Sequence, residues 1–328
     1  MPKVPHKRNN RFYNHGEEKA RSRLINVAQV AWQILVRRLQ AKRPPFVAKG
    51  MDLSPWVEKP NFTGTEGKTS VTWLGHASCL INFAGITVLT DPVSGGIGNL
   101  FNRSLPVPIP FEQLPHVDVI LLSHNHRDHL DIATLEPLKR FNPLIFVPEG
   151  DAHLLRSLGF HRVQECTWHE SIMLETNLEL NKVELIFLPA IHWSGRGVLD
   201  VNRSLWGSWL IRTKDASVYF AGDSAYGEHF ANIAHRYGPP DIVLMPIAPE
   251  EPRGLMAPSH VGVEEALQAF DDLAGSHFFP IHWGTFAFGL DRFQDPIEKL
   301  KELWPQSQRD NKKLHLVPAG RVVVLDNL

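Results

Sequence analysis

The sequence contains only two cysteines in 328 residues, Cys79 and Cys166, and neither lies in a C-x-x-C pair or beside a histidine at ligand spacing. This excludes a disulfide scaffold and disfavours a redox or thiolate–zinc site. No uninterrupted apolar run reaches the roughly 18 residues of a hydropathy-based transmembrane helix, which excludes such a span. The remaining composition, 43% hydrophobic and 21% charged, is that of an ordinary globular protein.

Negative charge is scarce at the N-terminal end of the chain. Residues 1–50 carry twelve Lys and Arg against two Glu, a balance of +10, whereas the other 278 residues carry 22 Lys and Arg against 33 Asp and Glu. A basic arm on an acidic body predicts an anionic partner for the arm. The acidic body argues against a track for a phosphate backbone, so we expect no role with nucleic acid.

The arm contains a candidate amphipathic helix. Residues 21–38 have a wide apolar face and a polar line at spacings of three and four. Cationic residues at both ends and Trp32 on the apolar face are typical of a helix at an anionic membrane surface. The alternative is a helix packed on its own domain or across a homodimer. No small-residue cleavage site precedes Pro44 and Pro45, so we predict a cytoplasmic protein peripheral to the membrane.

The chain divides into a basic arm with its linker, residues 1–68, and a main domain, residues 69–328. The main domain opens with strand-like runs joined by a hairpin at Ala84-Gly85 and continues with alternating strands and helices, which predicts a layered α/β protein. The predicted strands are Val71–Leu74, Cys79–Phe83, Ile86–Thr90, Val117–Leu122, Leu144–Val147, Val183–Leu188, Ser217–Ala221, Asp241–Pro246, Phe278–Ile281 and Arg321–Leu325. The predicted helices are Asp131–Phe141, Asp151–Leu158, Glu228–Tyr237, Val263–Leu273 and Asp295–Leu303.

One run of residues points to a metal site. The pattern H-x-H-x-D-H, formed by His124, His126, Asp128 and His129, directly follows an apolar strand. Four polar side chains this close together would all need partners if they were buried, which makes core packing a poor explanation. The spacing lets His124 and His126 face one ion, while Asp128 and His129 reach a second.

Three further strands are followed by possible ligands, namely His192, Asp223 and His282. The carboxyl ends of the strands share one edge of an α/β sheet, so residues far apart in sequence can converge there. Each of these histidines alone would be an ordinary structural residue. Together with the first cluster, they become candidate ligands of the same site.

These residues resemble the metallo-β-lactamase superfamily, whose fold is a four-layer αβ/βα sandwich with a dinuclear site along one edge. Further motifs are similar to the branch of N-acylphosphatidylethanolamine-hydrolysing phospholipase D, and the similarity runs from about Val71 to Phe286. The motifs are Val71-Thr72-Trp73-Leu74-Gly75-His76-Ala77, Leu89-Thr90-Asp91-Pro92, Leu205-Trp206-Gly207-Ser208-Trp209, Phe220-Ala221-Gly222-Asp223, Glu251-Pro252-Arg253 and His282-Trp283-Gly284-Thr285-Phe286.

The resemblance implies a ligand set. One ion would be held by His124, His126 and His192, the other by Asp128, His129 and His282, and both by Asp223. Nitrogen and oxygen ligands suit two zinc ions, although iron or manganese would also be accepted. Two such ions can lower the pKa of a shared water, and the resulting hydroxide would attack phosphorus.

Three other residues receive roles from the same resemblance. His260 would protonate the leaving oxygen or hold the phosphate, and Asp91 would act in the active site. Arg253 would face the phosphate. His76 is expected to orient a ligand rather than bind metal. The structural alternatives are a residue at a helix start for His260, a turn cap for Asp91 and a surface ion pair for Arg253.

The implied substrate is an N-acylphosphatidylethanolamine-like phospholipid, with the arm on an anionic membrane. Hydrolysis of a lactone or a small phosphate ester is the main alternative, because one dimetal core serves many substrates. A non-hydrolytic redox module is less favoured, since a carboxylate in place of His126 and a flavin domain are both absent. Deletion of residues 1–50 is expected to weaken vesicle binding and to spare turnover of a soluble diester.

Overall fold

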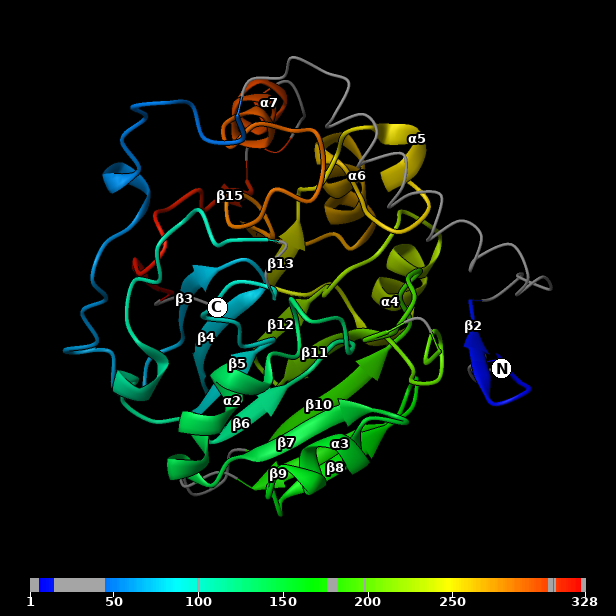
Figure 1. Ribbon diagram of the computed structural model, residues 1–328. Coiled ribbons are helices and arrows are strands. Elements are labelled where there is room, and N and C mark those ends of the chain that lie inside the picture. The colour runs from blue at the N-terminus through cyan, green and yellow to red at the C-terminus, as the bar shows by residue number, and fades with distance from the viewer. Residues whose placement is uncertain are drawn as a thin grey trace.

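The computed structural model describes residues 6–14, 45–98, 101–175, 182–197, 199–305, 309 and 311–325. Within them, two seven-stranded sheets lie face to face with helices on their outer sides (Figure 1). This is the predicted αβ/βα sandwich. The predicted amphipathic helix at residues 21–38 lies outside the described residues. None of the described helices has the length and hydrophobicity required to cross a bilayer.

The first sheet has the strand order β16-β3-β4-β5-β6-β7-β8. Its antiparallel part turns at Ala84 and Gly85, where φ angles of +50° and +85° form the tight hairpin that the sequence predicted. From β5 to β8 the strands are parallel. The strands are β3 (Ser70–Gly75), β4 (Ser78–Phe83), β5 (Ile86–Thr90), β6 (Val119–Leu121), β7 (Leu144–Pro148), β8 (Val163–Cys166) and β16 (Val322–Val324).

The second sheet has the order β15-β14-β13-β12-β11-β10-β9. Strands β9 to β12 are antiparallel neighbours and β12 to β15 are parallel neighbours, so β10, β12, β13 and β14 all run in the same direction. The strands are β9 (Ser171–Glu175), β10 (Lys182–Leu188), β11 (Ser208–Arg212), β12 (Ser217–Phe220), β13 (Ile242–Pro246), β14 (His277–Ile281) and β15 (Lys313–Leu314).

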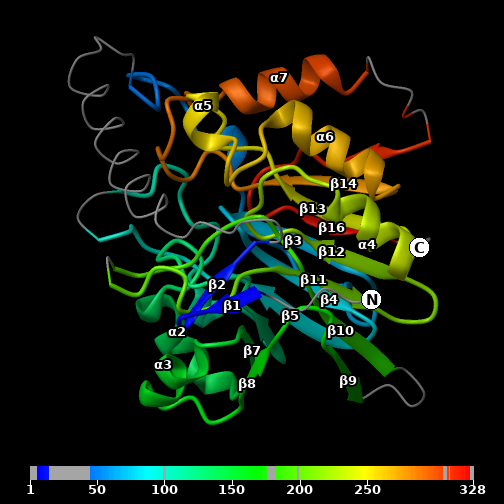
Figure 2. The ribbon, with the colours of Figure 1, turned by 90° about the vertical axis from the view of Figure 1, so that its right-hand side faces the viewer.

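Helices cover the outer faces of both sheets (Figure 2). Helix α6 shows why: Val263, Ala266, Leu267 and Phe270 recur at helical spacing and are all buried. All five predicted helical segments are confirmed. The described helices are α2 (Ile132–Leu138), α3 (Ala152–Ser157), α4 (His229–Tyr237), α5 (Arg253–Met256), α6 (Val263–Asp272) and α7 (Asp295–Leu303), with 3-10 turns η1 (Ser54–Trp56), η2 (Phe111–Gln113) and η3 (Lys139–Phe141).

Two segments of the predicted arm and linker pack on the main domain. A hairpin of β1 (His6–Arg8) and β2 (Arg11–Tyr13) buries Phe12 and Tyr13. The stretch predicted as a linker contributes Trp56, which meets Trp283 edge to face with ring centroids 5.3 Å apart. Sequence reasoning missed the hairpin and the strands β8, β9, β11 and β15. The predicted domain boundary at residue 68 stays a prediction.

Candidate metal centre

The candidate site lies where six strands end. Strands β3, β5 and β6 of the first sheet and β10, β12 and β14 of the second run in matching directions, so their carboxyl ends meet at one edge of the sandwich. The residues that follow these ends are His76, Asp91, His124, His192, Asp223 and His282. Four of these six are proposed ligands, and the other three proposed ligands, His126, Asp128 and His129, follow His124 in the same loop. The structure therefore brings together all seven side chains that the sequence proposed as ligands.

Three imidazole nitrogens form the first group. Nδ1 of His126 lies 2.8 Å from Nε2 of His124 and 3.3 Å from Nε2 of His192. Only one proton can be shared along each N···N contact, so three converging nitrogens cannot satisfy one another fully. A cation bound by all three lone pairs would satisfy them, which is the arrangement of a nitrogen-ligated metal.

A second group lies beside the first. Nε2 of His129 is 3.2 Å from Nε2 of His282 and 3.3 Å from Oδ2 of Asp128. Asp128 also lies 3.0 Å from Nε2 of His76, and the His76 ring packs on His282 with centroids 3.8 Å apart. His76 thus contacts two of the three members of this group, Asp128 and His282. Its Nε2 also lies close enough to be a candidate ligand, so its expected role of orienting a ligand stays a prediction.

Asp223 lies between the two groups. Its Oδ2 is 3.3 Å from Nε2 of His129 and 3.8 Å from Nε2 of His192, and its Oδ1 is 3.0 Å from Nε2 of His282. One carboxylate therefore faces nitrogens from both groups. This is the placement that a carboxylate bridging two cations requires.

The ring nitrogens that point away from the cluster are held by outer partners. Nδ1 of His282 donates to the Ala248 carbonyl at 2.8 Å, and Nδ1 of His192 donates to the Ser259 carbonyl at 2.9 Å. These bonds fix the tautomer in which Nε2 carries the lone pair. Outer partners of this kind are typical of metal-binding histidines. Together with the nitrogen- and oxygen-only donor set, they indicate that the residues present fit a pair of divalent cations.

The electrostatics favour the deprotonated form for most of the proposed ligands. His129 is the exception: burial opposes its protonation, yet the carboxylates of Asp223 and Asp128 hold its pKa well above the ordinary value. Burial lowers the pKa of the first group of imidazoles, to about 4 for His126, to about 3 for His192 and well below the usual range for His124. Burial opposes ionisation of Asp128 and Asp223, yet the neighbouring imidazoles hold their pKa values well below the ordinary value. Neutral imidazoles and ionised carboxylates are the forms that bind metals.

The backbone at the site is in a conformation that side chains rarely adopt. The φ angles of His76, Asp91 and His282 are +53°, +32° and +65°. Left-handed backbone at non-glycine residues costs free energy and concentrates at functional sites. Gly222 also has a positive φ, +58°, and a Cβ there would lie 2.6 Å from the Cβ of Ser123. This glycine therefore lets the turn before Asp223 approach the histidine loop.

Asp91 lies behind the cluster and is fully buried. Its Oδ1 accepts from the Ser123 N–H at 2.7 Å, and its Oδ2 accepts from Nδ1 of His129 at 2.7 Å and from the Ser123 hydroxyl at 2.5 Å. Nδ1 of His124 in turn lies 2.9 Å from that hydroxyl. Both carboxylate oxygens are occupied by groups that orient ligands, which favours a positioning role over contact with substrate.

His260 and Arg253 lie on the other side of Asp223. Nδ1 of His260 is 3.6 Å from Oδ2 of Asp223, and burial lowers the pKa of this ring to about 3. Arg253 donates from Nη2 to the His260 carbonyl at 2.9 Å and to Glu265 at 2.5 Å. Arg253 therefore holds the loop of His260 through Nη2, while its buried Nη1 makes no hydrogen bond to the described residues.

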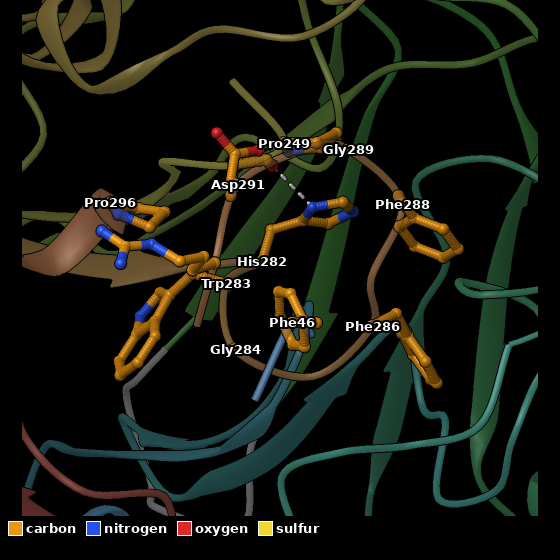
Figure 3. A pocket seen from close by; sticks show the side chains of 12 residues that line it. Phe46, Pro249, His282, Trp283, Gly284, Phe286, Phe288, Gly289, Asp291 and Pro296 are labelled. Atoms are coloured by element: carbon orange, nitrogen blue, oxygen red, sulfur yellow. Dashed lines mark hydrogen bonds between the residues drawn. The ribbon is translucent and has the colours of Figure 1, made fainter. Parts of the chain in front are cut away.

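Two features of the site were missed from sequence. A small hollow adjoins His282, and Figure 3 shows the rings of Phe286, Phe288 and Phe46 around it. Phe286 belongs to a motif that the sequence analysis singled out, but no local pattern predicted that a hollow would form there. The second feature is Asn14 of the arm, which hydrogen-bonds the main chain of His192 and has no signal in the sequence.

Comparison with known proteins agrees with this geometry. A family model described as a Beta-lactamase superfamily domain matches residues 87–283. Igni18, a novel metallo hydrolase from the archaeon Ignicoccus hospitalis, superposes with a TM-score of 0.60 over 79% of this chain and 98% of its own, at 19% identity. At this identity the likeness shows the fold alone.

Two relatives are closer in sequence. The mitochondrial N-acyl-phosphatidylethanolamine-hydrolyzing phospholipase D of Saccharomyces cerevisiae is 34% identical over 242 residues, 71% of this chain, and the chain spans only 51% of that protein. The N-acyl-phosphatidylethanolamine-hydrolyzing phospholipase D 1 of Caenorhabditis elegans is 32% identical over 253 residues, which cover 73% of this chain and 70% of the relative. The chain therefore belongs to the beta-lactamase superfamily, in the family that includes the N-acyl-phosphatidylethanolamine-hydrolyzing phospholipases D, and is a metal-dependent hydrolase.

Proposed function

We propose that this hydrolase is a dinuclear phosphodiesterase of the phospholipase D type, which cleaves an N-acylphosphatidylethanolamine-like phospholipid. The observation that carries the proposal is Asp223, whose two oxygens face Nε2 atoms of both imidazole groups. A pair of cations spaced by one carboxylate suits an in-line displacement at phosphorus. The names of the two relatives support the phospholipid substrate.

The proposed ligands are His124, His126 and His192 for one cation, Asp128, His129 and His282 for the other, and Asp223 for both. Two bound zinc ions, or iron or manganese in their place, supply Lewis acidity that activates water and stabilises charge on phosphoryl oxygens. The protein holds these ligands in place through partners such as Ser259 and Ala248.

His260 is proposed to contact the phosphate. Its ring lies within 5.2 Å of the His192 ring and 5.9 Å of the His282 ring, centroid to centroid, so it faces both groups. A neutral imidazole offers one N–H donor, which suits binding of a phosphate oxygen, whereas proton transfer to the leaving oxygen would require the imidazolium form. Arg253 donates to the His260 carbonyl, and its buried Nη1 has no hydrogen-bond partner among the described residues.

The aromatic rings beside His282 are proposed to contact an apolar part of the substrate. The rings of Phe286 and Phe288 pack with centroids 5.4 Å apart (Figure 3). The Phe288 ring also lies 5.7 Å from the His76 ring, centroid to centroid. An apolar wall next to a polar reaction centre matches an amphipathic lipid better than a small soluble ester. This supports the phospholipid over the lactone.

The experiment compares three substrates with the purified protein: an N-acylphosphatidylethanolamine in mixed micelles, a lactone and a chromogenic phosphodiester. We expect the lipid to give the highest kcat/KM and to release N-acylethanolamine and phosphatidic acid. The His126→Ala variant should lose turnover by several orders of magnitude, whereas His153→Ala, an exposed histidine on α3, should not change it. Faster turnover of the lactone than of the lipid would contradict the proposal.

Membrane binding by the basic arm is proposed on its charge and on the amphipathic pattern of residues 21–38. Deletion of residues 1–50 is an unsuitable test, because it also removes Phe12 and Asn14, which pack on the domain. Charge reversal at Arg37 and Arg38 keeps Phe12 and Asn14 in the chain. We expect this variant to sediment less with anionic vesicles at low salt and to keep its turnover of the soluble diester. Unchanged sedimentation would contradict the membrane role.

A further inference from the structure

The N-terminal hairpin is bonded to the loop that carries His192. Phe12 donates its N–H to the Asn202 carbonyl at 2.8 Å, and the Arg11 guanidinium donates to the carbonyls of Val201 and Leu199. Figure 1 shows this hairpin at the edge of the molecule, beside the segment that follows β10. These contacts keep the hairpin on one loop of the candidate site rather than on an unrelated surface.

Asn14, the residue after β2, binds the main chain of His192 on both sides. Its Oδ1 accepts from the His192 N–H at 3.2 Å, and its Nδ2 donates to the His192 carbonyl at 3.1 Å. Oδ1 also accepts from Nε1 of Trp206 at 2.9 Å. Asn14 is 4% exposed. Among side chains, only a carboxamide presents an acceptor and a donor in one plane for such a pair of bonds.

The bonds to Asn14 complete the fixing of His192. The Ser259 carbonyl sets the ring tautomer through Nδ1, while Asn14 sets the backbone from which the ring extends. Nε2 then lies 3.3 Å from Nδ1 of His126. Loss of either constraint would let this nitrogen move, and a ligand displaced by about 1 Å no longer fits the short metal–nitrogen bond.

We propose that Asn14 is a positioning residue of the metal centre and that the N-terminal hairpin is an integral part of that centre. The inference rests on the metal site of the proposed function. It ties the first cation, the one facing His192, to a side chain 178 residues away in sequence. A purely structural Asn14 would stabilise the loop equally in the metal-free and metal-bound protein, and it would leave the affinity for metal unchanged.

The test is a titration of metal-free protein with Co²⁺, followed by its d–d absorption, and with Zn²⁺ against a chromophoric chelator. We expect Asn14→Ala to weaken binding of one of two ions by roughly 10–100-fold, with a changed cobalt spectrum. Asn14→Asp, which keeps the shape but sets an oxygen against the His192 carbonyl, should also weaken it. Asn232→Ala, the same change at an exposed position of α4, is the matched control and should behave as wild type.

Three outcomes would overturn the inference. Wild-type affinity for both ions in Asn14→Ala, with a lowered Tm of the metal-free protein, would mean a structural role only. If Asn14→Ala does not fold, wild-type affinity in Asn14→Asp has the same meaning. A wild-type protein that binds no cation would instead overturn the proposed function, and this inference with it, and is recognised because the control fails as well.

Discussion

Asp91 and His129 are joined by a fully buried hydrogen bond, 2.7 Å from Oδ2 of the carboxylate to Nδ1 of the ring. The other ring nitrogen, Nε2, faces Asp128 and Asp223 in the cluster. The bond therefore decides which nitrogen of His129 carries the lone pair that faces the candidate cation. Asp91 therefore acts on the site indirectly, by holding His129 and Ser123.

The Asp91→Asn substitution tests this role. An amide nitrogen at the Oδ2 position would face the proton on Nδ1 of His129, and the ring would have to move that proton to Nε2. We expect metal affinity to fall by roughly 10–100-fold, measured by competition with a chelator. Asp215→Asn, at an exposed turn, is the matched control and should have no effect. Wild-type affinity combined with lost turnover would instead favour the direct catalytic role that the family resemblance implied.

Removal of the metal should destabilise the protein. Asp128 and Asp223 lie within 3.8 Å of imidazole nitrogens that cannot all satisfy one another, and cations bound to the folded state stabilise it by mass action. We expect a chelator to lower the wild-type Tm by several °C, on the order of 2 °C per kcal/mol for a chain longer than 250 residues, and Zn²⁺ to restore it. His126→Ala should show a smaller chelator effect. If the chelator lowered the Tm of His126→Ala as much as that of wild type, the metal would bind at another site.

Gly222 offers a test of the close approach between two segments of the site. A Cβ at Gly222 would lie 2.6 Å from the Cβ of Ser123, whereas a Cβ at Gly238, which also has a positive φ, would meet nothing within 4 Å. Gly238→Ala should therefore cost backbone strain alone, roughly 1–3 kcal/mol, because its φ of +88° and ψ of +162° lie in a region used almost only by glycine. Gly222→Ala should cost more than this in unfolding free energy and also reduce metal content. Equal losses of stability with unchanged metal content would show that the approach is not required.

The sequence predicted the parts of the site that are local. The strand Val117–Leu122 and the ligand run after it are contiguous, so a short pattern contains both. The convergence of His192 and His282 followed from the rule that carboxyl ends of parallel strands share an edge. Five of the six strands that carry the site were predicted with boundaries within one residue of those observed, and the exception is β6, which begins two residues later than predicted.

What was missed depends on contacts between distant segments. Strand β11 begins at Ser208, next to a glycine that would discourage any strand assignment. The structure explains Gly207 by its packing, because a Cβ there would lie 2.4 Å from the Leu188 carbonyl of the neighbouring strand. Asn14 has an ordinary local sequence, and its role exists only because the hairpin reaches His192. Left-handed backbone at Asp91 and His282 is likewise imposed by the surrounding fold.

Asp151 is not a proposed ligand, but its titration should make the stability of the folded protein depend on pH. Its Oδ1 accepts from Asn125, which lies between two candidate ligands, and from the Ser204 hydroxyl, at 2.9 Å and 2.7 Å. Its Oδ2 is buried without a hydrogen-bond partner among the residues that the structure describes. Burial raises the pKa of this carboxyl to about 7, so the folded protein holds a proton there that the unfolded chain releases near pH 3.8.

The sign of the effect follows from this difference. Between about pH 4 and pH 7 the folded state binds more protons than the unfolded state, so the contribution of Asp151 to stability falls as the pH rises. Asp151→Asn keeps an acceptor for Asn125 and Ser204 and removes the titration. We expect the unfolding free energy of wild type, relative to the variant, to decrease by a few kcal/mol across this window, on the order of 1.4 kcal/mol per pKa unit. Denaturant unfolding of both proteins in excess chelator, which removes metal-linked protons, measures the difference. A constant difference from pH 4 to pH 8 would mean that Asp151 is ionised in the folded protein, and that Asn125 is held by a charge rather than by a neutral acid.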